Sequence, residues 1–287
     1  MKWKFSTRET DEALRFYREQ GFVAFDDLLG EEDVKKLHAA YEETLRNGNY
    51  GEKPGEMVDG SDAVFRHPLY ETYMRDPRIV SIVEKIFGAD KGIELQHSKL
   101  NCKPAADTGK GVVEWHQDYP FFPHTNFDLI AVGIHFDDED ETSGPLCIIP
   151  GSFKQGVLSH CEEGKFVYRC TAKFDETKGV LLTGKRGMIT IHDCRTLHAS
   201  ARKTSESRRR LLVLQYRTDD NVQISGVLWR STGLAITANK SNGTARFPDG
   251  LVVENRGKGG RLYDKYGKLA PDQQPKPEST SAPKYGD

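Results

Sequence analysis

Residues 114–120 read Glu114-Trp115-His116-Gln117-Asp118-Tyr119-Pro120. In this stretch an imidazole and a carboxylate stand two residues apart, and another histidine, His198, follows 82 residues after His116 (198 − 116 = 82). Two histidines and one carboxylate form the facial set of ligands that holds non-heme Fe(II) and leaves coordination positions open. A His-x-Asp motif alone is weak evidence, because these residues fall two apart by chance in many proteins. Its meaning therefore depends on the rest of the chain.

The spacing of this motif has a simple geometric interpretation. On a β-strand, side chains two residues apart point to the same face of the sheet. We therefore expect His116 and Asp118 to lie on one strand and to reach a single metal ion past Gln117. A β-barrel that folds the chain back on itself would bring His198 alongside.

The composition excludes several classes of protein. The chain has 287 residues and a formal net charge of −2, which gives no basis for electrostatic binding to nucleic acid or to a membrane surface. No run approaches the roughly 18 apolar residues that a membrane span needs, and no apolar secretion signal is visible at the start. Five scattered cysteines without a C-x-x-C pair favour a reducing, cytoplasmic location. They are Cys102, Cys147, Cys161, Cys170 and Cys194.

The first 90 residues predict helices that pack on a core. A helix is expected over Thr10–Gln20, with Thr10 as its N-cap and Gly21 ending it, followed by a brief buried strand to Phe25. A second helix is expected from Glu31 to about Arg46. Residues 47–68 are polar and aperiodic, which predicts a long loop. A third helix carries an apolar stripe at helical spacing, formed by Ile79, Ile82, Val83 and Ile86.

From Ile93 onward the pattern changes to short segments rich in β-branched and aromatic residues, separated by turn clusters. Such segments without long helices between them predict an antiparallel sandwich or barrel. Two of them, Leu129–Phe136 and Leu211–Tyr216, are nearly all apolar, as expected for strands covered on both faces. The expected strands are Ile93–Cys102, Leu129–Phe136, Leu146–Ile149, Phe166–Cys170, Met188–Ile191 and Leu211–Tyr216.

These segments predict one domain over residues 1–269. It consists of N-terminal helices at 10–90, a β core at about 93–217 and a C-terminal extension at 218–269. The last stretch, 270–287, is rich in Pro, Gln, Ser and Lys. It holds too few apolar residues to offset the entropy of ordering, so we expect a disordered tail and assign it no function.

Beyond the opening motif, further motifs follow in a fixed order, and together they resemble the phytanoyl-CoA dioxygenase (PhyH-like) family of Fe(II)- and 2-oxoglutarate-dependent oxygenases. The similarity runs from about Gly21 to about Tyr216. The motifs that carry it are His116-Gln117-Asp118, Phe122-Pro123, Asp128-Leu129-Ile130, Gly144-Pro145-Leu146, Pro150-Gly151-Ser152-Phe153-Lys154, His198-Ala199-Ser200 and Arg209.

The resemblance implies a fold, a set of cofactors and a set of site residues. The fold would be a mostly β double-stranded β-helix, that is, a jelly-roll or cupin-like barrel with flanking α-helices. His116, Asp118 and His198 would bind Fe(II), and 2-oxoglutarate and O2 would take the open positions. In the family an arginine eleven residues after the distal histidine binds the far carboxylate of 2-oxoglutarate, which here is Arg209. Ser200 and, on the preceding strand, Lys99 would also contact this cosubstrate.

Several alternatives remain at these positions. His192 lies near the distal site and could be the ligand instead of His198, although its spacing to the arginine cluster does not fit. Arg208 and Arg210 flank Arg209, and a slip of one residue would place the wrong side chain inside, since adjacent strand residues face opposite sides. Three further histidines are expected to be structural or to line the substrate region: His97, His124 and His135.

The chain departs from the family pattern at two positions of the loop after the distal histidine, where Ala199 replaces a usual glycine and Lys203 a frequent asparagine. Neither change affects the metal ligands. Asp118 matters more, because related halogenases have a small residue there that opens a site for chloride. Its presence favours hydroxylation over halogenation.

The resulting hypothesis is a dioxygenase that hydroxylates an unactivated C–H bond of a small molecule and releases succinate and CO2. The same oxidising chemistry could instead desaturate, epimerise, cyclise or form a peroxide, and a non-catalytic jelly-roll ligand-binding protein is the alternative from another class. The pocket mouth is expected at residues 47–68, at 119–125 and after Asp219, including Trp229 and Arg230. Three side chains could line the pocket or belong to the core: Tyr119, Phe121 and Phe122. The sequence does not determine the oligomeric state.

Overall fold

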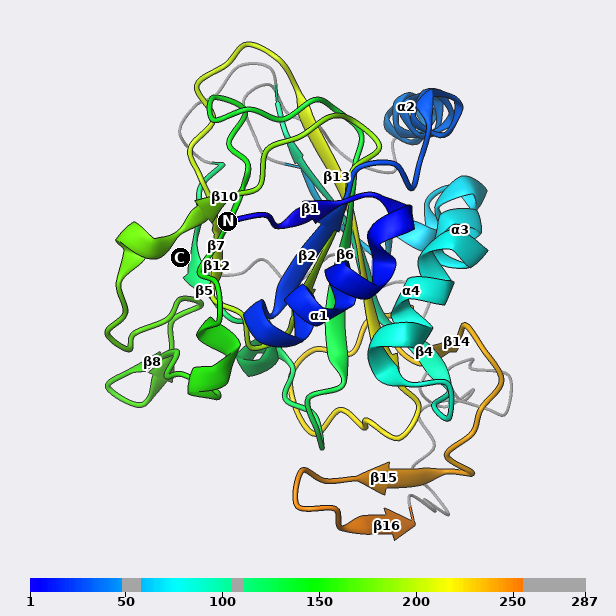
Figure 1. Cartoon of the computed structure of the whole chain (residues 1–287), viewed down its shortest axis with the longest axis vertical. Helices are drawn as coiled ribbons and strands as arrows, with labels where there is room; N and C mark the ends of the chain where they lie inside the picture. Colours follow the sequence, from blue (N-terminus) through cyan, green and yellow to red (C-terminus); the bar gives the residue numbers. More distant parts are fainter. Residues whose placement is uncertain (48–57, 105–110, 255–287) are drawn as a thin grey trace.

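The computed structural model describes residues 1–47, 58–104 and 111–254. Two β-sheets lie face to face, and helices cover the outer face of the larger sheet (Figure 1). The larger sheet contains, in spatial order, β1 (Lys4–Phe5), β2 (Phe22–Phe25), β11 (Ile189–Asp193), β6 (Leu129–His135), β13 (Arg209–Thr218), β4 (Ile93–Lys103) and β14 (Leu234–Ala235), and β3 (Val58–Ser61) also pairs with β4.

The smaller sheet lies opposite and supplies much of the site described below. Its strands, in spatial order, are β10 (Val180–Leu181), β7 (Leu146–Ile148), β12 (His198–Ser200) and β5 (Val113–His116). Two short hairpins stand apart from both sheets, β8 (Cys161–Glu162) with β9 (Lys165–Phe166) and β15 (Thr244–Arg246) with β16 (Val252–Glu254). The two facing sheets with outer helices confirm the predicted double-stranded β-helix with flanking α-helices.

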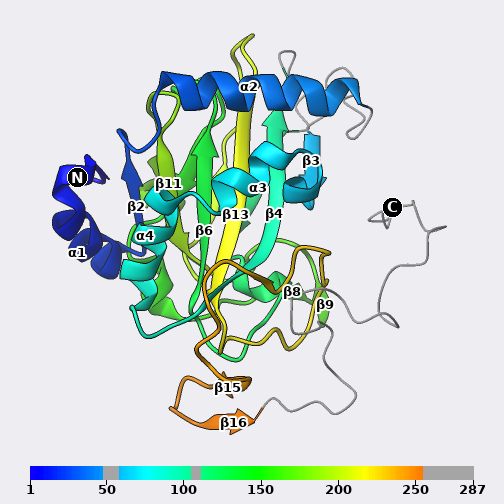
Figure 2. The same cartoon turned by 90° about the vertical axis from the view of Figure 1, so that its right-hand side faces the viewer.

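The helices pack on the larger sheet through apolar side chains. Figure 2 shows α2, α3 and α4 lying across that face. The α-helices are α1 (Thr10–Gln20), α2 (Glu31–Arg46), α3 (Pro68–Met74) and α4 (Pro77–Phe87). The stripe of α4, including Ile79 and Val83, is buried in one cluster with Leu212 and Leu214 of β13. Because the opposite face of β13 carries Arg209 and Gln215, this strand separates the apolar core from the polar barrel interior.

Most predicted elements of the N-terminal part are confirmed, with three corrections. Glu9, not Thr10, is the N-cap of α1, while Gly21 ends the helix in a left-handed conformation with φ 77°. The expected loop at 47–68 contains β3 and a 3₁₀ helix, η2 (Ala63–Phe65); residues 48–57 lie outside the described residues. Helix α3 was not predicted, because its seven residues are too few to show a helical period.

The β region needs one further correction. The expected strand Phe166–Cys170 is reduced to β9, which pairs only with β8 across a two-residue turn. The strand ends at Phe166, Tyr168 has a positive φ of 61°, and Cys170 N–H donates instead to the carbonyl of Trp115 in β5. The predicted tail at 270–287 lies outside the described residues, so its disorder stays a prediction. No helix in the described ranges is long and apolar enough to cross a membrane.

A bulge in β4 decides which of its side chains enter the barrel. The register with β13 shifts so that His97 pairs with Gln215 but Leu95 pairs with Tyr216, which leaves Gln96 as an extra residue. Leu95 and Leu100 both belong to the helix-side core, although strict alternation would put them on opposite faces. The bulge therefore turns His97, and the odd-numbered residues after it, toward the smaller sheet.

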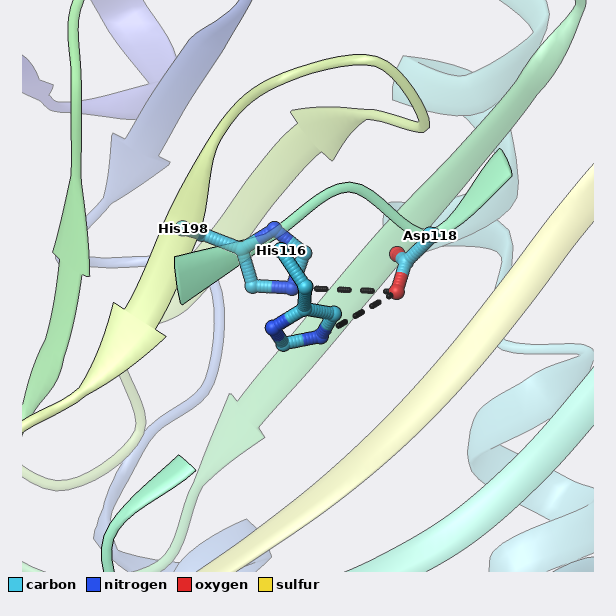
Figure 3. A group of neighbouring side chains, drawn as sticks. All are labelled: His116, Asp118 and His198. Carbon is cyan, nitrogen blue, oxygen red and sulfur yellow. Dashed lines mark ion pairs between the residues drawn. The ribbon is translucent and has the colours of Figure 1, made fainter. Parts of the chain in front are cut away.

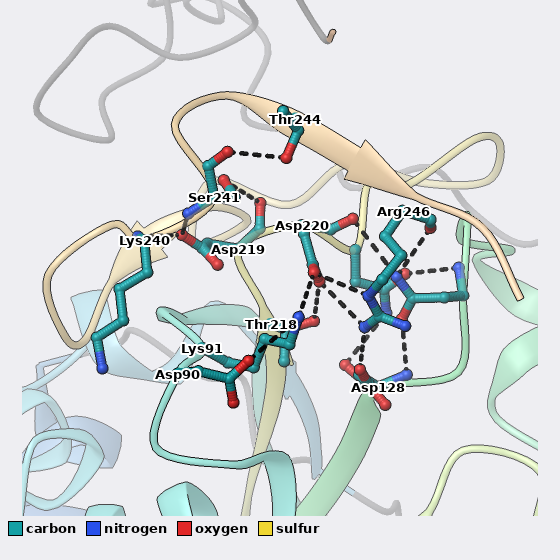
Figure 4. A network of polar contacts seen from close by, with 12 residues as sticks. Asp90, Lys91, Asp128, Thr218, Asp219, Asp220, Lys240, Ser241, Thr244 and Arg246 are labelled. Carbon is teal, nitrogen blue, oxygen red and sulfur yellow. Dashed lines mark hydrogen bonds and ion pairs between the residues drawn. The ribbon is translucent and has the colours of Figure 1, made fainter. Parts of the chain in front are cut away.

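The C-terminal extension is fastened to the barrel by a network of polar contacts (Figure 4). Asp220, which follows β13, accepts hydrogen bonds from Arg246 Nε at 2.9 Å, from Lys91 Nζ at 3.0 Å and from Thr218 Oγ1 at 2.7 Å. Arg246 also pairs with Asp128. These contacts anchor β15 beside the end of β13.

Candidate active site

Three side chains that the sequence singles out converge on one point between the sheets. Each of His116, Asp118 and His198 offers a ligand atom, and these atoms all lie within 4.8 Å of one another. The Asp118 Oδ1 atom is 3.9 Å from His116 Nε2 and 3.7 Å from His198 Nε2 (Figure 3). The two histidines face each other across the β5–β12 pairing, with ring centroids 4.1 Å apart.

Backbone carbonyls fix the orientation of both imidazoles. His116 Nδ1 lies 2.8 Å from the carbonyl oxygen of Glu114, and His198 Nδ1 lies 2.9 Å from that of Thr196. Each Nδ1–H donates to its carbonyl, so each Nε2 keeps a free lone pair toward the shared point. Burial lowers the pKa of His116 to about 4 and holds that of His198 well below its usual value. Both rings are therefore neutral, as metal ligands must be.

The motif reaches this geometry differently from the prediction. Strand β5 ends at His116, and Asp118 has helical backbone angles (φ −69°, ψ −37°) at the start of η3 (Tyr119–Phe121). The buried amide of Gln117 holds this turn in place, since it donates to the carbonyls of Gly156 at 2.9 Å and Arg195 at 2.6 Å. The carboxylate is thus placed by a clamped glutamine and not by strand alternation.

His192 does not join the three converging ligand atoms. Its Nε2 lies 3.4 Å from Asp118 Oδ2, whereas His116 and His198 contact the other oxygen, Oδ1. Burial disfavours the charged form of Asp118, but His198, His192 and His116 outweigh it and hold the pKa of this carboxyl below its usual range. His192 therefore contacts the second carboxylate oxygen and supports the charged form of Asp118, and its ring centroid lies 4.4 Å from that of His198.

Of three consecutive arginines, Arg209 alone points into the barrel. Its side chain is almost completely buried, and its Nη2 donates to Ser200 Oγ at 2.8 Å and to the carbonyl of Gly144 at 3.0 Å. Arg208 and Arg210 instead reach outward, to Glu42 at 3.0 Å and to Asp137 at 2.6 Å. Because Ser200 and His198 are two residues apart on β12, their positions along the strand are about 7 Å apart.

A buried acid lies behind Arg209. Glu139 Oε1 is 2.6 Å from His135 Nδ1 and 3.7 Å from Arg209 Nε, and His135 Nε2 is 3.0 Å from Thr190 Oγ1. Burial disfavours the charged carboxylate, but His135 and Arg209 outweigh it and lower the pKa of Glu139. His135 is thus a structural histidine, as one of the two predicted alternatives had it.

A cavity of about 650 Å³ opens above the triad. Lys99 of β4 lines it, and no hydrogen bond or ion pair joins its ammonium to another described residue. The positive charge of Lys99 contributes to the lowered pKa of His116, so it lies at the metal end of the barrel interior. Besides Lys99, His116 and Asp118, the cavity is lined by Ser61, His97, Pro120, Phe121, Phe122, Pro123, Phe166, Tyr168, Gln215, Ser225, Gly226, Val227 and Trp229.

The expected pocket mouth is confirmed in part. Phe121, Phe122 and Trp229 line the cavity, whereas Tyr119 packs on Phe127 at 5.1 Å between ring centroids. The guanidinium of Arg230 lies over the ring of a phenylalanine outside the cavity lining. Of the described residues in the segment 47–68, Ser61 lines the cavity.

The remaining two histidines differ in their surroundings, and three cavity residues were not predicted from the sequence. His97 lines the cavity, while His124 is a buried structural residue whose Nε2 lies 3.0 Å from Gln96 Oε1. Gln215, Phe166 and Tyr168 line the cavity without having been predicted. For Gln215 a signal exists, since it is the one polar residue in the segment Leu211–Tyr216.

Comparisons with known proteins agree with this geometry. The sequence pattern of the phytanoyl-CoA dioxygenase (PhyH) family matches residues 17–211. The protein named "Probable alpha-ketoglutarate-dependent hypophosphite dioxygenase" from Stutzerimonas stutzeri is 32% identical over 233 residues, which cover 73% of this chain and 79% of that protein.

Two solved structures share the fold. The epimerase SnoN in complex with Fe3+, alpha ketoglutarate and nogalamycin RO superposes with a TM-score of 0.66 at 17% identity, covering 77% of this chain and 88% of SnoN. EctD from S. alaskensis with 2-oxoglutarate and 5-hydroxyectoine superposes with a TM-score of 0.58 at 18% identity, covering 80% of each chain. The chain thus belongs to the phytanoyl-CoA dioxygenase family and is an Fe(II)- and 2-oxoglutarate-dependent dioxygenase.

Proposed function

We propose that this enzyme hydroxylates an unactivated C–H bond of a small organic molecule and releases succinate and CO2. The observation that carries the proposal is the placement of Arg209 and Ser200 relative to the triad. About 7 Å along β12 separates the level of His198 from that of Ser200, which suits the length of an extended five-carbon diacid. One end of 2-oxoglutarate would then meet the metal while the other meets the arginine.

We assign the metal ligands to His116, Asp118 and His198. Two neutral imidazoles and one ionised carboxylate are the donors that non-heme Fe(II) prefers, and their ligand atoms lie close enough to share one ion. His192 orients the second oxygen of Asp118 and is not a ligand in this assignment. When iron is bound, one atom of O2 oxidises 2-oxoglutarate to succinate and CO2, and the other enters the substrate C–H bond.

We assign the cosubstrate contacts to Arg209, Ser200 and Lys99. Arg209 would bind the far carboxylate with its planar fork of N–H groups, and Ser200 would add a hydroxyl. Glu139 holds the guanidinium in place from behind. Lys99 would pair with the carboxylate at the metal end, because its charge lies near His116 and has no partner among the described residues.

One feature favours hydroxylation over halogenation. Asp118 occupies the position that must be vacated for chloride to bind a metal held by this ligand set, so halogenation is disfavoured. Phe121 and Phe122 line the same cavity and reduce access of water, which hydroxylation and the other oxidative outcomes all require. Desaturation, epimerisation, cyclisation or peroxide formation would use the same ligands, and SnoN is an epimerase of the same fold.

Turnover of the cosubstrate tests the proposal. Purified protein loaded with Fe(II) should convert 2-oxoglutarate and O2 to succinate, with a hydroxylated product once a substrate is present. The His116→Ala variant should lose this turnover, whereas His67→Ala, at the start of α3, should keep it. Succinate formation that is equal in the wild type and in His116→Ala would rule the assignment out.

The relatives do not by themselves identify the substrate, because hypophosphite, 5-hydroxyectoine and nogalamycin RO differ widely in size. We propose a small-molecule substrate without a nucleic-acid or membrane partner. We also propose a cytoplasmic location, which the five unpaired cysteines support.

A further inference from the structure

Two polar side chains on neighbouring strands face the cavity without a partner. His97 on β4 and Gln215 on β13 are opposite each other in the register, so their Cβ atoms are about 5 Å apart. The two residues are 5% and 4% exposed, yet His97 Nδ1 and Gln215 Oε1 have no hydrogen-bond partner. Buried polar atoms are nearly always paired, so unpaired ones in the wall of a cavity point to a ligand.

The chemistry of this pair limits the group that it can bind. Burial holds the pKa of His97 well below its usual value, so the ring is neutral and offers one N–H and one acceptor nitrogen. The amide of Gln215 likewise offers both a carbonyl acceptor and N–H donors. A hydroxyl or an amide group can donate and accept in the same place. A carboxylate or another ionised oxyanion only accepts, and would leave an acceptor of the pair unsatisfied.

Aromatic rings form the rest of the cavity wall. Trp229 stacks on His97 with a centroid distance of 3.9 Å and an interplanar angle of 28°. Phe166 packs edge-on against Phe121 at 5.1 Å and against Tyr168 at 4.9 Å. Flat apolar surfaces of this kind favour a ligand with its own ring, because stacked and edge-to-face contacts add to the burial of apolar area.

Size and charge narrow the ligand further. At ~30 Å³ for each water, the volume of about 650 Å³ corresponds to about 20 water molecules, so even with 2-oxoglutarate bound at Lys99 it leaves far more room than a small inorganic anion fills. Among the described residues that line the cavity, Asp118 is the one acid, and it faces the histidines of the triad. No carboxylate in this set is left to pair with a cationic substrate.

We infer that the cavity accepts a neutral, ring-containing molecule with a hydroxyl or amide group, which His97 and Gln215 bind while its ring lies against Trp229 and Phe121. The inference rests on the proposed function, because it takes this cavity to be the substrate site. The bulge at Gln96 serves this arrangement, since it turns His97 into the barrel opposite Gln215.

Matched small probes test the inference. The protein is loaded with diamagnetic Zn(II) and 2-oxoglutarate, so that no turnover occurs, and binding of 1-indanol, indane, 1-aminoindane and hypophosphite is measured by ligand-observed NMR. We expect 1-indanol to bind about tenfold more tightly than indane or 1-aminoindane, and hypophosphite not to displace it. Equal binding of indane, tighter binding of the amine, or displacement by hypophosphite would overturn the inference.

Two variants show whether the named pair is responsible. Gln215→Leu and His97→Phe remove the hydrogen-bonding atoms and keep the approximate volume, so each should bring the 1-indanol to indane affinity ratio close to one. Gln20→Leu, at the end of α1, makes the same chemical change outside the cavity and should leave the ratio at about ten. A general loss of folding lowers both affinities and does not move their ratio. An unchanged ratio in both cavity variants would refute the role of the pair.

Binding of 2-oxoglutarate, measured by calorimetry with Mn(II), distinguishes a failure of the proposed function from a failure of the substrate inference. If the wild type does not bind 2-oxoglutarate, the proposed function fails. If it binds 2-oxoglutarate but shows no preference for 1-indanol over indane, the proposed function stands and the inference about the substrate fails.

Discussion

The polar cluster around Asp220 and the polar face of the cavity are both largely withdrawn from water, but their hydrogen bonding differs. Asp220 accepts from Arg246, Lys91 and Thr218 within 3.0 Å (Figure 4). On the cavity face, His97 Nδ1 and Gln215 Oε1 have no partner. Since an unpaired buried polar atom costs about 1–3 kcal/mol, the first cluster stabilises the fold, and the second leaves atoms available to a ligand in the cavity.

Hydrogen bonding also distinguishes two buried histidines that residue type does not. His135 and His97 are both buried histidines on strands of the larger sheet, and sequence alone does not tell them apart. His135 uses both ring nitrogens within the protein, at Glu139 and Thr190, whereas His97 keeps Nδ1 unpaired beside the cavity. Substitutions in the Asp220 cluster should therefore change the stability, whereas substitutions in the site should change binding and turnover.

The largest effect is expected at the carboxylate of the triad. Asp118→Ala removes the one anionic ligand and leaves two neutral imidazoles, so we expect loss of Fe(II) binding and no measurable turnover of 2-oxoglutarate to succinate. Metal content after dialysis and succinate release measure the two effects. Asp90→Ala removes a carboxylate whose side chain is 79% exposed, and it should keep both.

His192 provides the contrast within the same site. It contacts Asp118 from outside the ligand set, so His192→Gln should weaken metal binding by roughly 10- to 100-fold and keep turnover at saturating iron. His198→Ala should lose turnover at any iron concentration. If the two variants behaved in the opposite way, His192 would be the ligand.

The next effect concerns the cosubstrate. Arg209→Gln removes the buried guanidinium, and we expect the Kd of 2-oxoglutarate to rise about 100-fold, which corresponds to about 3 kcal/mol. Arg209→Lys keeps the charge without the planar fork, so its Kd for 2-oxoglutarate should lie between those of the wild type and Arg209→Gln. Titration calorimetry with Mn(II) measures these constants.

The neighbouring arginine is the control for that experiment. Arg208 lies on the outer side of the strand, where it pairs with Glu42, so Arg208→Gln should leave the Kd of 2-oxoglutarate unchanged. An equal loss in Arg208→Gln and Arg209→Gln would show that the effect comes from the strand and not from the inward side chain.

Much of this site could be predicted because its residues follow one another at fixed spacings. His116, Asp118 and His198 were named from the sequence, and the structure brings them together. The outward faces of Arg208 and Arg210 also follow from strand alternation once Arg209 is placed inside. Alternation fails at β4, where strict counting from Leu95 would put His97 on the helix side of the sheet.

The remaining features depend on contacts between distant segments. Asp118 lies outside the strand, next to Gln117, whose amide donates to the carbonyls of Gly156 and Arg195. These partners are distant in the sequence, so no local pattern predicts the contact. The bulge at Gln96 is visible only in the pairing of β4 with β13. A single glutamine in an apolar strand was the one available signal for the cavity face, and it marks Gln215.

On the other side of the comparison, Arg246→Gln should reduce stability and leave the site intact. The change removes the guanidinium from Asp220 and Asp128, and we expect a loss of about 2 kcal/mol in the free energy of unfolding. Urea unfolding measures this loss, and the Kd of 2-oxoglutarate should remain that of the wild type. A changed Kd with unchanged stability would reverse the roles assigned to the two clusters.

The smallest effect is a pH dependence that belongs to the same closed network. Burial disfavours the charge on Asp220, but hydrogen bonds from Arg246, Thr218 and Lys91 outweigh it and lower its pKa from 3.8 to about 2. Because the pKa is lower in the folded state, the carboxylate contributes stability that is present above pH 4 and is lost as the pH falls through 2. The stability difference between the wild type and Asp220→Asn should therefore shrink by about 1 kcal/mol between pH 6 and pH 3. A stability difference that stays constant over this range would mean that the network does not hold Asp220 in its charged form. The cluster around Asp220 would then not have the structural role assigned to it.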